Sequence, residues 1–386
     1  MARRRVLYTV NRMDVGGSQT HLIQVLRLLD RERFDPILCC LTGKGALLDA
    51  ARDTGTRVVN GGLGGLKSPR ALTALARLRA FMRDERIDVV HNYLLRANVI
   101  GTLAARAARV PVVLASKRGC HERRGWEMVG ARVSNRLADC VTANSNAVRE
   151  FVHDHEGCPL EKMVVIPSGI DTERFAPLPP GDHKARLGLP PGAVVVGSLT
   201  RMRVRKGVEE FLHAMGPICR ARPEVHVVVA GEVEWDDEVR ALVAATGLGD
   251  RLHLLGRRSD VPEVVSAFDV FVLSSHGEGM SNAILEAMAM EKPVVATAVG
   301  GTVEVVAEGV TGHLVPARDA AALAAGIERV LDDPERGRAM GARGRQVVID
   351  RFSARAMVRQ METLYTRMLA AREAGQPATA ALSTVQ

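Results

Sequence analysis

Short apolar runs rich in β-branched residues alternate along the chain with segments of helical periodicity. A run of about four to eight apolar residues between turn signals predicts a buried strand. The first half of the chain contains six such runs: residues 5–10, 35–41, 88–91, 111–115, 140–143 and 163–166. Helices are expected between them, for example over residues 18–29 and 71–83. This alternation predicts a parallel sheet with helices on its faces.

The second half of the chain repeats the alternation of strands and helices. It contains six further apolar runs: residues 193–199, 225–230, 251–255, 269–273, 293–297 and 313–315. Five prolines between Asp171 and Pro191 separate the two series, and proline disfavours the interiors of helices and strands. The sequence therefore predicts an α/β fold of two Rossmann-like domains with parallel sheets, facing each other across a cleft.

The proline-rich break also sets the expected domain boundaries. We expect an N-terminal domain, a linker, a C-terminal domain, a terminal helix that returns to the N-terminal domain, and a tail: residues 1–175, 176–191, 192–350, 351–372 and 373–386. The tail is rich in Ala, Thr, Pro and Gln, a composition typical of a flexible chain end.

Composition excludes several classes of protein. The chain has 386 residues, of which 47% are hydrophobic and 25% charged, as is typical of a folded soluble protein. Aromatic residues make up only 3%, which argues against a stacking platform for single-stranded nucleic acid, so no nucleic-acid partner is expected. We find neither a secretory signal nor a membrane-spanning apolar run. Six cysteines without metal-ligand spacing indicate free thiols in a reducing cytosol.

Positive charge is concentrated in the first half of the chain. Residues 1–180 contain 28 Lys and Arg against 18 Asp and Glu, whereas residues 181–386 contain 24 against 26. This asymmetry indicates an anionic partner, either a membrane surface or a phosphorylated substrate. Two segments supply arginines that could face a membrane: Arg70, Arg77, Arg79, Arg83 and Arg86, and Arg118, Arg123, Arg124 and Arg132. The alternative is a solvated surface whose arginine content reflects coding bias.

Ligands of open α/β sheets bind outside the carboxyl ends of the strands, so the loops there are candidate sites. Gly16 and Gly17 follow the first strand and open a helix, where backbone N–H groups can approach a phosphate. A plain turn with Ser18 as helix N-cap explains the two glycines equally well. His91 is expected at the carboxyl end of its strand, although a lone histidine is more often structural.

Two segments of the second half carry more specific chemistry. Arg201 to Lys206 places four cations before a helix, which suits a diphosphate clamp; a solvated basic loop or a nucleic-acid patch are the alternatives. Ser274 to Ala287 predicts a glycine-containing loop that carries Glu278, followed by a helix that carries Glu286. Two carboxylates beside a helix N-terminus could bind sugar hydroxyls while the helix binds a phosphate. Alternatively, Glu286 only complements the helix dipole.

These residues together resemble the retaining glycosyltransferases of family 4, which have the GT-B fold. The resemblance covers about residues 5–350 and rests on motifs that occur in order: Gly16-Gly17, Asp88 to His91, Asn144-Ser145, Ile166 to Asp171, Arg201 with Lys206, Gly231 and Gly256, and Glu278 with Glu286. Two positions depart from the family pattern. Gln19 stands where a Glu often follows the double glycine, and Ser168 replaces the usual Asn.

The resemblance implies a role for each matching residue. Glu286 would bind the ribose hydroxyls, Arg201 and Lys206 the diphosphate, and Glu278 the donor sugar. Gly17 would approach the phosphates, and His91 would lie near the reacting centre, so His91 and Glu278 are the expected catalytic residues. The loop and the helix start complete the expected donor site with Gly279, Met280, Ser281 and Asn282. Members of the family need no divalent metal, so neither a metal nor another cofactor is expected.

The expected function is therefore a cytoplasmic, metal-independent, retaining hexosyltransferase. Its donor would be a nucleotide diphosphate sugar, UDP by family frequency, with GDP as the alternative. Its acceptor would be a hydroxyl of a glycan or a lipid-linked glycan in surface polysaccharide or glycolipid synthesis, with peripheral docking on an anionic inner membrane face. Two other classes stay open: a nucleotide-sugar epimerase or phosphorylase on the same frame, and a non-catalytic subunit that resembles a glycosyltransferase.

Overall fold

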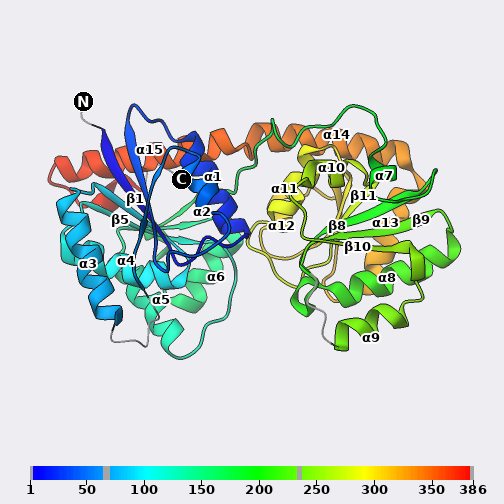
Figure 1. Cartoon of the computed structure of the whole chain (residues 1–386), viewed down its shortest axis with the longest axis horizontal. Coiled ribbons are helices and arrows are strands. Elements are labelled where there is room, and N and C mark those ends of the chain that lie inside the picture. The colour runs from blue at the N-terminus through cyan, green and yellow to red at the C-terminus, as the bar shows by residue number, and fades with distance from the viewer. Residues whose placement is uncertain (1–2, 64–69, 233–236, 383–386) are drawn as a thin grey trace. The chain divides into compact units, whose positions relative to one another are not determined.

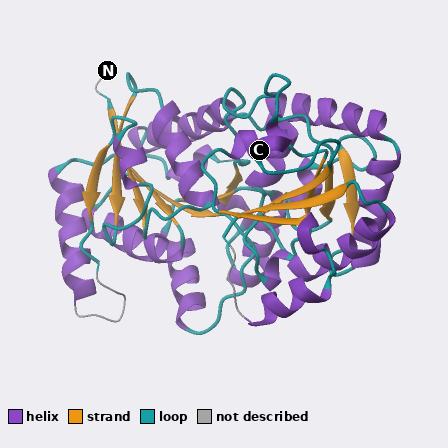
Figure 2. Cartoon of the chain, turned by 45° about the vertical axis from the view of Figure 1, so that its right-hand side comes forward, coloured by secondary structure: helices purple, strands orange, loops and turns teal. Residues whose placement is uncertain are grey.

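The computed structural model of the chain describes residues 3–63, 70–232 and 237–382. It divides into two compact units, which Figure 1 shows with their elements labelled. Unit 1 comprises residues 1–169 and 354–386, and unit 2 comprises residues 170–353. Figure 2 shows that the strands of each unit form a sheet with helices around it. No helix in the described ranges has both the length and the apolar character needed to cross a bilayer.

Unit 1 contains a seven-stranded parallel sheet in the order β3-β2-β1-β4-β5-β6-β7. Its strands are β1 Arg4–Val10, β2 Phe34–Cys40, β3 Arg57–Asn60, β4 Val89–Tyr93, β5 Val112–Lys117, β6 Cys140–Ala143 and β7 Met163–Val165. Every residue of β4, β5 and β6 is buried, as expected of parallel strands covered on both faces. Six of the seven strands correspond to the apolar runs of the sequence; β3 is the strand that the pattern did not predict.

Helices cover both faces of this sheet: α1 Gly17–Leu28, α2 Leu48–Arg52, α3 Arg70–Asp84, α4 Leu95–Ala108, α5 Trp126–Leu137 and α6 Asn146–Glu156. Alternate residues of β1 point to opposite faces, because the side-chain period of a strand is two. Tyr8 packs with α1 in one apolar core, whereas Leu7 packs with α3 and α4 in the other.

The C-terminal segment returns to unit 1. Helix α14 ends at Arg351, and the separate helix α15, Ala354–Glu373, packs Val358, Met361 and Tyr365 into the same core as α1. The tail does not fray after this helix. Ala378 and Leu382 are fully buried in that core, so the described part of the expected flexible tail is packed; residues 383–386 lie outside the described residues.

Unit 2 contains a six-stranded parallel sheet in the order β10-β9-β8-β11-β12-β13, the strand order of a Rossmann-like domain. Its strands are β8 Val194–Leu199, β9 Val225–Ala230, β10 Leu252–Gly256, β11 Val270–Leu273, β12 Val294–Thr297 and β13 Gly312–Val315. All six correspond to predicted apolar runs. The helices are α7 His183–Arg186, α8 Val208–Ala221, α9 Asp237–Ala245, α10 Val261–Ser266, α11 Asn282–Ala289, α12 Thr302–Val305, α13 Ala320–Asp332 and α14 Pro334–Arg351.

The proline-rich segment expected as a linker belongs to unit 2. Phe175 and Leu189 are buried in one of its two apolar cores, and Lys184 of α7 donates a hydrogen bond to Asp269. The boundary between the units therefore falls at Gly169 and Ile170 rather than at residues 176–191. Prolines stop the regular elements here, but the apolar residues between them still fold onto the core.

Candidate donor site and the carboxyl edges of the two sheets

Three loops meet at the carboxyl edge of the unit 2 sheet, those after β8, β11 and β12. Glycines permit their backbones to touch. A Cβ on Gly207 (φ +64°) would lie 1.8 Å from the carbonyl oxygen of Ser274, and one on Gly300 (φ +50°) would lie 1.8 Å from that of Glu278. The N–H of Gly301 donates to the carbonyl oxygen of Gly279 over 2.7 Å. The loop that carries Glu278 is thus fixed from two sides.

Lys206 and Glu278 form the charged centre of this loop cluster. Lys206 ends the 3₁₀ turn Val204–Lys206 after β8, and its Nζ donates to Oε1 of Glu278 over 2.5 Å. The hydroxyl of Ser275 donates to the same oxygen over 2.7 Å. The lysine side chain is 23% exposed and the glutamate side chain 13%, so the pair is accessible to a ligand. The structure therefore brings together two residues that lie 72 positions apart in the sequence.

The start of α11 lies in the same loop cluster. Ser281 occupies the N-cap position but makes no side-chain capping hydrogen bond, and Met280 and Ser281 are both buried. Asn282 is the first residue of the helix. A helix N-terminus carries the positive end of the helix dipole. Phosphate oxygens fit such a position well.

Glu286 lies on the second turn of α11 and is half-buried. Burial raises the pKa of Glu286 to about 7, an effect that the charge of Arg174 partly offsets. Within the described residues, no hydrogen bond to its carboxylate is found. The first turn of α11 holds no acidic residue, and the helix dipole acts mainly on the first turn, so dipole compensation does not explain Glu286. A desolvated carboxylate without a donor suits a ligand that supplies hydroxyl groups.

Arg201 also follows β8 but points to a different partner. Its Nε lies 3.9 Å from Oε2 of Glu232 in the loop after β9, and Glu232 is bonded to Arg257 as well. Gly231 allows this contact, because a Cβ there would lie 1.9 Å from the carbonyl oxygen of Thr200. Arg201 thus lies at the same sheet edge as Lys206, held by a second acidic residue that the sequence motifs did not include.

In unit 1, Gly17 is the first residue of α1, directly after the loop that follows β1. Gly16 is the N-cap residue and has no side-chain cap, so Ser18 does not cap the helix as the plain-turn interpretation required. A Cβ on Gly16 would lie 2.9 Å from Oε1 of Gln19, the residue that replaces the usual Glu. The start of α1 therefore lacks the Ser18 cap, and the approach of Gly17 to a phosphate stays a prediction.

His91 is a core residue, which corrects its expected position. The strand β4 does not end at His91 but continues to Tyr93, so the imidazole points into the sheet face. It is fully buried: Nδ1 is hydrogen-bonded to the hydroxyl of Tyr365 over 2.6 Å and Nε2 to that of Thr142 over 3.2 Å. Burial lowers the pKa of His91 to about 3, so it stays neutral. Both nitrogens are used inside unit 1, which gives His91 a structural role.

Sequence reasoning did not assign Arg118 or His21 to the carboxyl edge of the unit 1 sheet, although Asn144 and Ser168 belong to the motifs of the resemblance. Arg118 directly follows β5 and donates to the Ser168 hydroxyl over 3.0 Å. Burial lowers the pKa of Arg118 to about 10. Within the described residues, Oδ1 of Asn144 and Nδ1 of His21 are buried without a hydrogen-bond partner. The signal was the position of Arg118 directly after a buried strand, but the charge argument had counted Arg118 among the membrane-facing arginines.

Two of the arginines expected on a membrane-facing surface are therefore partly buried and make contacts within unit 1. Arg118 contacts Ser168, and Arg123 lies 3.0 Å from the buried carboxylate of Glu156. The side chain of Arg70 lies outside the described residues. The other expected arginines are exposed on the surface: Arg77, Arg79, Arg83, Arg86, Arg124 and Arg132.

Comparison with known proteins agrees with this geometry. The family described as Glycosyltransferase Family 4 matches residues 15–174, and the family described as Glycosyl transferases group 1 matches residues 181–347. UDP-Gal:alpha-D-GlcNAc-diphosphoundecaprenol alpha-1,3-galactosyltransferase of Escherichia coli is 29% identical over 92% of this chain and 95% of its own length. The GDP-mannose-dependent alpha-(1-6)-phosphatidylinositol monomannoside mannosyltransferase of Mycolicibacterium smegmatis is 31% identical over 78% of this chain and 82% of its own.

Among solved structures, Anabaena Alr3699/HepE in complex with UDP and glucose superposes with a TM-score of 0.81 at 23% identity. The match covers 93% of this chain and 98% of that chain. Two parallel-sheet α/β units with such a neighbour define the GT-B fold. The chain belongs to the glycosyltransferases of group 1 and family 4.

Proposed function

We propose that the chain transfers a sugar from a UDP-sugar to a hydroxyl of a glycan or lipid-linked acceptor, with retention of the anomeric configuration and without a divalent metal. The observation that carries the donor assignment is the loop cluster of unit 2. There an accessible lysine, a desolvated glutamate and a helix start without a side-chain cap lie at one sheet edge. UDP is the nucleotide in the names of the E. coli relative and the Anabaena structure, whereas the M. smegmatis relative uses GDP-mannose.

Each part of the cluster has a role in donor binding. Glu286 accepts hydrogen bonds from the two ribose hydroxyls, since a carboxylate can accept from a vicinal diol. Lys206 and Arg201 bind the diphosphate together with the N–H groups at Gly279 to Asn282. Glu278 holds the Nζ of Lys206 in place and accepts from hydroxyls of the donor sugar. Charge complementarity at a preorganised site supplies the stabilisation of the leaving diphosphate.

The chemical step needs no protein nucleophile. The bond between the anomeric carbon and the phosphate oxygen breaks, and a bond from the acceptor oxygen to the same face of that carbon forms. The acceptor proton passes to the leaving phosphate oxygen. The protein positions both substrates and stabilises the negative charge on the diphosphate, and two cations with a helix N-terminus can do this without a metal.

Excess EDTA should leave the rate unchanged. Loss of activity on chelation that Mg²⁺ or Mn²⁺ restores would contradict metal independence.

Unit 1 offers groups for an anionic acceptor. Arg118 is a part-buried cation, and His21 and Asn144 hold polar atoms without partners in the described parts of the chain. Burying unsatisfied polar groups is costly, so such atoms suit a site that a ligand completes. The diphosphate of a lipid-linked glycan would supply both the negative charge and the hydrogen-bond partners.

The surface of α5 supports docking on an anionic membrane. Trp126, Val129 and Val133 are exposed along one side of this helix, although they are apolar. Arg124, Arg132 and Arg136 are exposed beside them. An exposed apolar stripe with flanking arginines fits the boundary between lipid headgroups and acyl chains. We therefore assign the membrane contact to α5 rather than to α3.

Product analysis tests the proposed function. The purified chain is incubated with UDP-sugars and GDP-mannose, with and without a lipid-linked glycan acceptor, and the products are analysed by NMR. We expect an α-linked product from an α-linked donor, formed only with acceptor. Conversion of the donor without acceptor would indicate an epimerase, and release of a sugar 1-phosphate a phosphorylase. Absence of any turnover together with tight nucleotide binding would indicate a non-catalytic subunit.

A further inference from the structure

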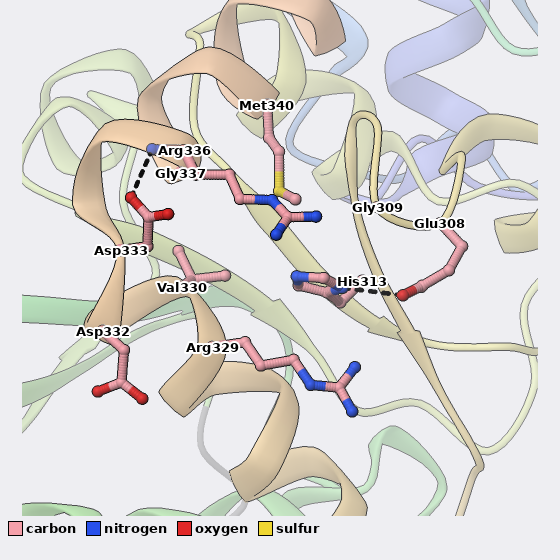
Figure 3. A pocket seen from close by; sticks show the side chains of 10 residues that line it. All are labelled: Glu308, Gly309, His313, Arg329, Val330, Asp332, Asp333, Arg336, Gly337 and Met340. Atoms are coloured by element: carbon pink, nitrogen blue, oxygen red, sulfur yellow. Dashed lines mark hydrogen bonds and ion pairs between the residues drawn. The ribbon is translucent and has the colours of Figure 1, made fainter.

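Unit 2 contains a second polar pocket that the donor site does not use. Its volume is about 480 Å³, and Figure 3 shows the residues that line it. They come from three elements: the turn and start of β13, the end of α13, and the first two turns of α14. A pocket of this size is large enough for a small polar metabolite.

The pocket lies at the opposite edge of the sheet from the donor loops. Val330 and Gly337 line it, and both residues also line a neighbouring hollow. That hollow is bordered by Val194, Val225 and Val270, which are the first residues of β8, β9 and β11. The strands are parallel, so these residues mark the amino edge of the sheet. A ligand here would be separate from a nucleotide sugar at the carboxyl edge.

His313 is the central group of the pocket. It is only 7% exposed, and its Nδ1 is hydrogen-bonded to Oε1 of Glu308 over 2.9 Å. The other oxygen of Glu308 accepts from the N–H of Leu314, so the carboxylate fixes the ring. In Figure 3 the second ring nitrogen points away from Glu308 into the pocket. Within the described residues this nitrogen, Nε2, has no hydrogen-bond partner.

Two arginines line the pocket around this ring. Figure 3 draws the guanidinium groups of Arg336 and Arg329 on either side of His313. In the described ranges, neither guanidinium forms a salt bridge or a side-chain hydrogen bond. The carboxylates nearby have partners already: Asp332 is paired with Arg222, and Asp333 accepts from the N–H of Arg336 as the N-cap of α14.

These groups define the chemistry of the ligand. Two exposed guanidinium groups, Arg329 in the last turn of α13 and Arg336 in the first turn of α14, are suited to a phosphate group, because Arg forks onto phosphate oxygens. Glu308, Asp333 and the free nitrogen of His313 can accept hydrogen bonds from hydroxyl groups. We propose that this pocket binds a sugar phosphate as a second ligand, separate from the nucleotide-sugar donor.

The experiment is a calorimetric titration with glucose 1-phosphate as the probe. The full chain is first saturated with UDP, which keeps the probe out of the donor site. Inorganic phosphate and glucose are titrated in parallel. We expect glucose 1-phosphate to bind at least tenfold more tightly than phosphate, and glucose to show no binding. Phosphate that binds as tightly as glucose 1-phosphate would overturn the sugar part of the proposal, and absence of binding by both would overturn the site.

Surface variants keep this test independent of folding. The double variant Arg329→Ala/Arg336→Ala changes two exposed side chains, so the fold should survive. The double variant should bind glucose 1-phosphate at least tenfold more weakly than the wild type does, and its affinity for UDP should be unchanged. The control is Arg343→Ala, which removes an exposed arginine further along α14 that does not line the pocket. Equal affinity of glucose 1-phosphate for the wild type and the double variant would contradict the assignment.

Discussion

Each unit contains a lysine and a glutamate whose charged atoms lie 2.5 Å apart, yet the two pairs differ in access. Lys117 ends β5 and pairs with Glu156 at the end of α6, and both side chains are only 2% exposed. Lys206 and Glu278 lie in loops and are 23% and 13% exposed. The same ion pair is thus closed to solvent in unit 1 and open to a ligand in unit 2.

The partners around each glutamate explain the difference in role. Glu156 also accepts from Nδ2 of Asn135 over 3.0 Å and lies 3.0 Å from Nε of Arg123. This buried carboxylate therefore has several donors, and burial without them would be costly. Glu278 receives Lys206 and Ser275 from neighbouring loops at the sheet edge. The distance between the charged atoms does not distinguish the two pairs, whereas exposure and position at the carboxyl edge do, and these two features are the reason for proposing Lys206 and Glu278 as ligand-binding residues.

Breaking the closed pair should have the largest effect. Lys117→Met leaves the buried charge of Glu156 without its closest partner, and we expect the free energy of unfolding to fall by about 3 to 5 kcal/mol. Urea denaturation followed by circular dichroism measures this loss. The matched control is Lys206→Met, where the partly exposed pair should contribute no more than about 1 kcal/mol. Equal destabilisation by the two variants would remove the distinction between the pairs.

Turnover should depend on the accessible residues of unit 2, whose replacement has little effect on stability. Glu286→Ala and Lys206→Ala each remove a directed contact to the nucleotide diphosphate, so turnover should fall about a hundredfold, or about 3 kcal/mol in transition-state stabilisation. The melting temperature should stay close to that of the wild type. Glu209→Ala, which removes an exposed glutamate on α8, is the control and should keep wild-type turnover. Near-normal activity in either site variant would exclude that residue from the donor site.

A smaller effect should distinguish two exposed arginine surfaces of unit 1. Arg124→Ala/Arg132→Ala removes charge beside the apolar stripe of α5, whereas Arg77→Ala/Arg79→Ala removes the same charge from α3. At about 1 kcal/mol per arginine near an anionic surface, the α5 variant should bind anionic vesicles about thirtyfold more weakly at low salt. Co-sedimentation measures this binding. The α3 variant should bind as the wild type does, and the reverse ranking would move the membrane contact to α3.

The two glutamates Glu156 and Glu286 should also differ in their response to pH. Burial raises the pKa of Glu286 to about 7. Burial alone would raise that of Glu156 too, but Lys117, Asn135 and Arg123 together hold the pKa of Glu156 below its ordinary value. Ribose hydroxyls bind the ionised form of Glu286 better, so donor binding below pH 7 must release a proton.

The affinity for the nucleotide sugar should therefore rise severalfold between about pH 6 and pH 8. The same titration with Glu286→Gln is the control, because an amide does not ionise in this range. Its affinity should be independent of pH. A pH profile that survives in the Gln variant would assign the dependence to another group.

The sequence pattern predicted the strands that contain a run of several apolar residues, including the partly exposed edge strand β10, and missed the strand that does not. Twelve strands correspond to continuous apolar runs. The thirteenth, β3, has only Val58 and Val59 between polar ends at the sheet edge, too short for a periodicity argument. The end of β4 was misplaced because His91, Asn92 and Tyr93 look polar although all three are buried. Burial of polar residues depends on partners such as Tyr365, which lies 274 positions from His91.

The residues of the candidate site also fall into two groups, those that local sequence motifs predict and those that only contacts between distant loops reveal. Local motifs pointed to Lys206, Glu278 and Glu286, because a basic loop and two carboxylates near a helix start are short-range patterns. Arg118 and Glu232 were not found, since their significance comes from contacts between loops after different strands. Arg118 and Arg123 likewise differ from the exposed arginines only through their contacts with the buried residues Ser168 and Glu156, which the sequence alone does not show.

The most direct test of the donor assignment is a calorimetric titration of UDP and of GDP into the wild type, Glu286→Gln, Lys206→Met and Lys117→Met under conditions where all are folded. The account predicts that one of the two nucleotides binds the wild type and Lys117→Met with equal affinity. It predicts at least tenfold weaker binding by Glu286→Gln and Lys206→Met. Unchanged affinity in both of these variants would contradict a donor site at the carboxyl edge of the unit 2 sheet.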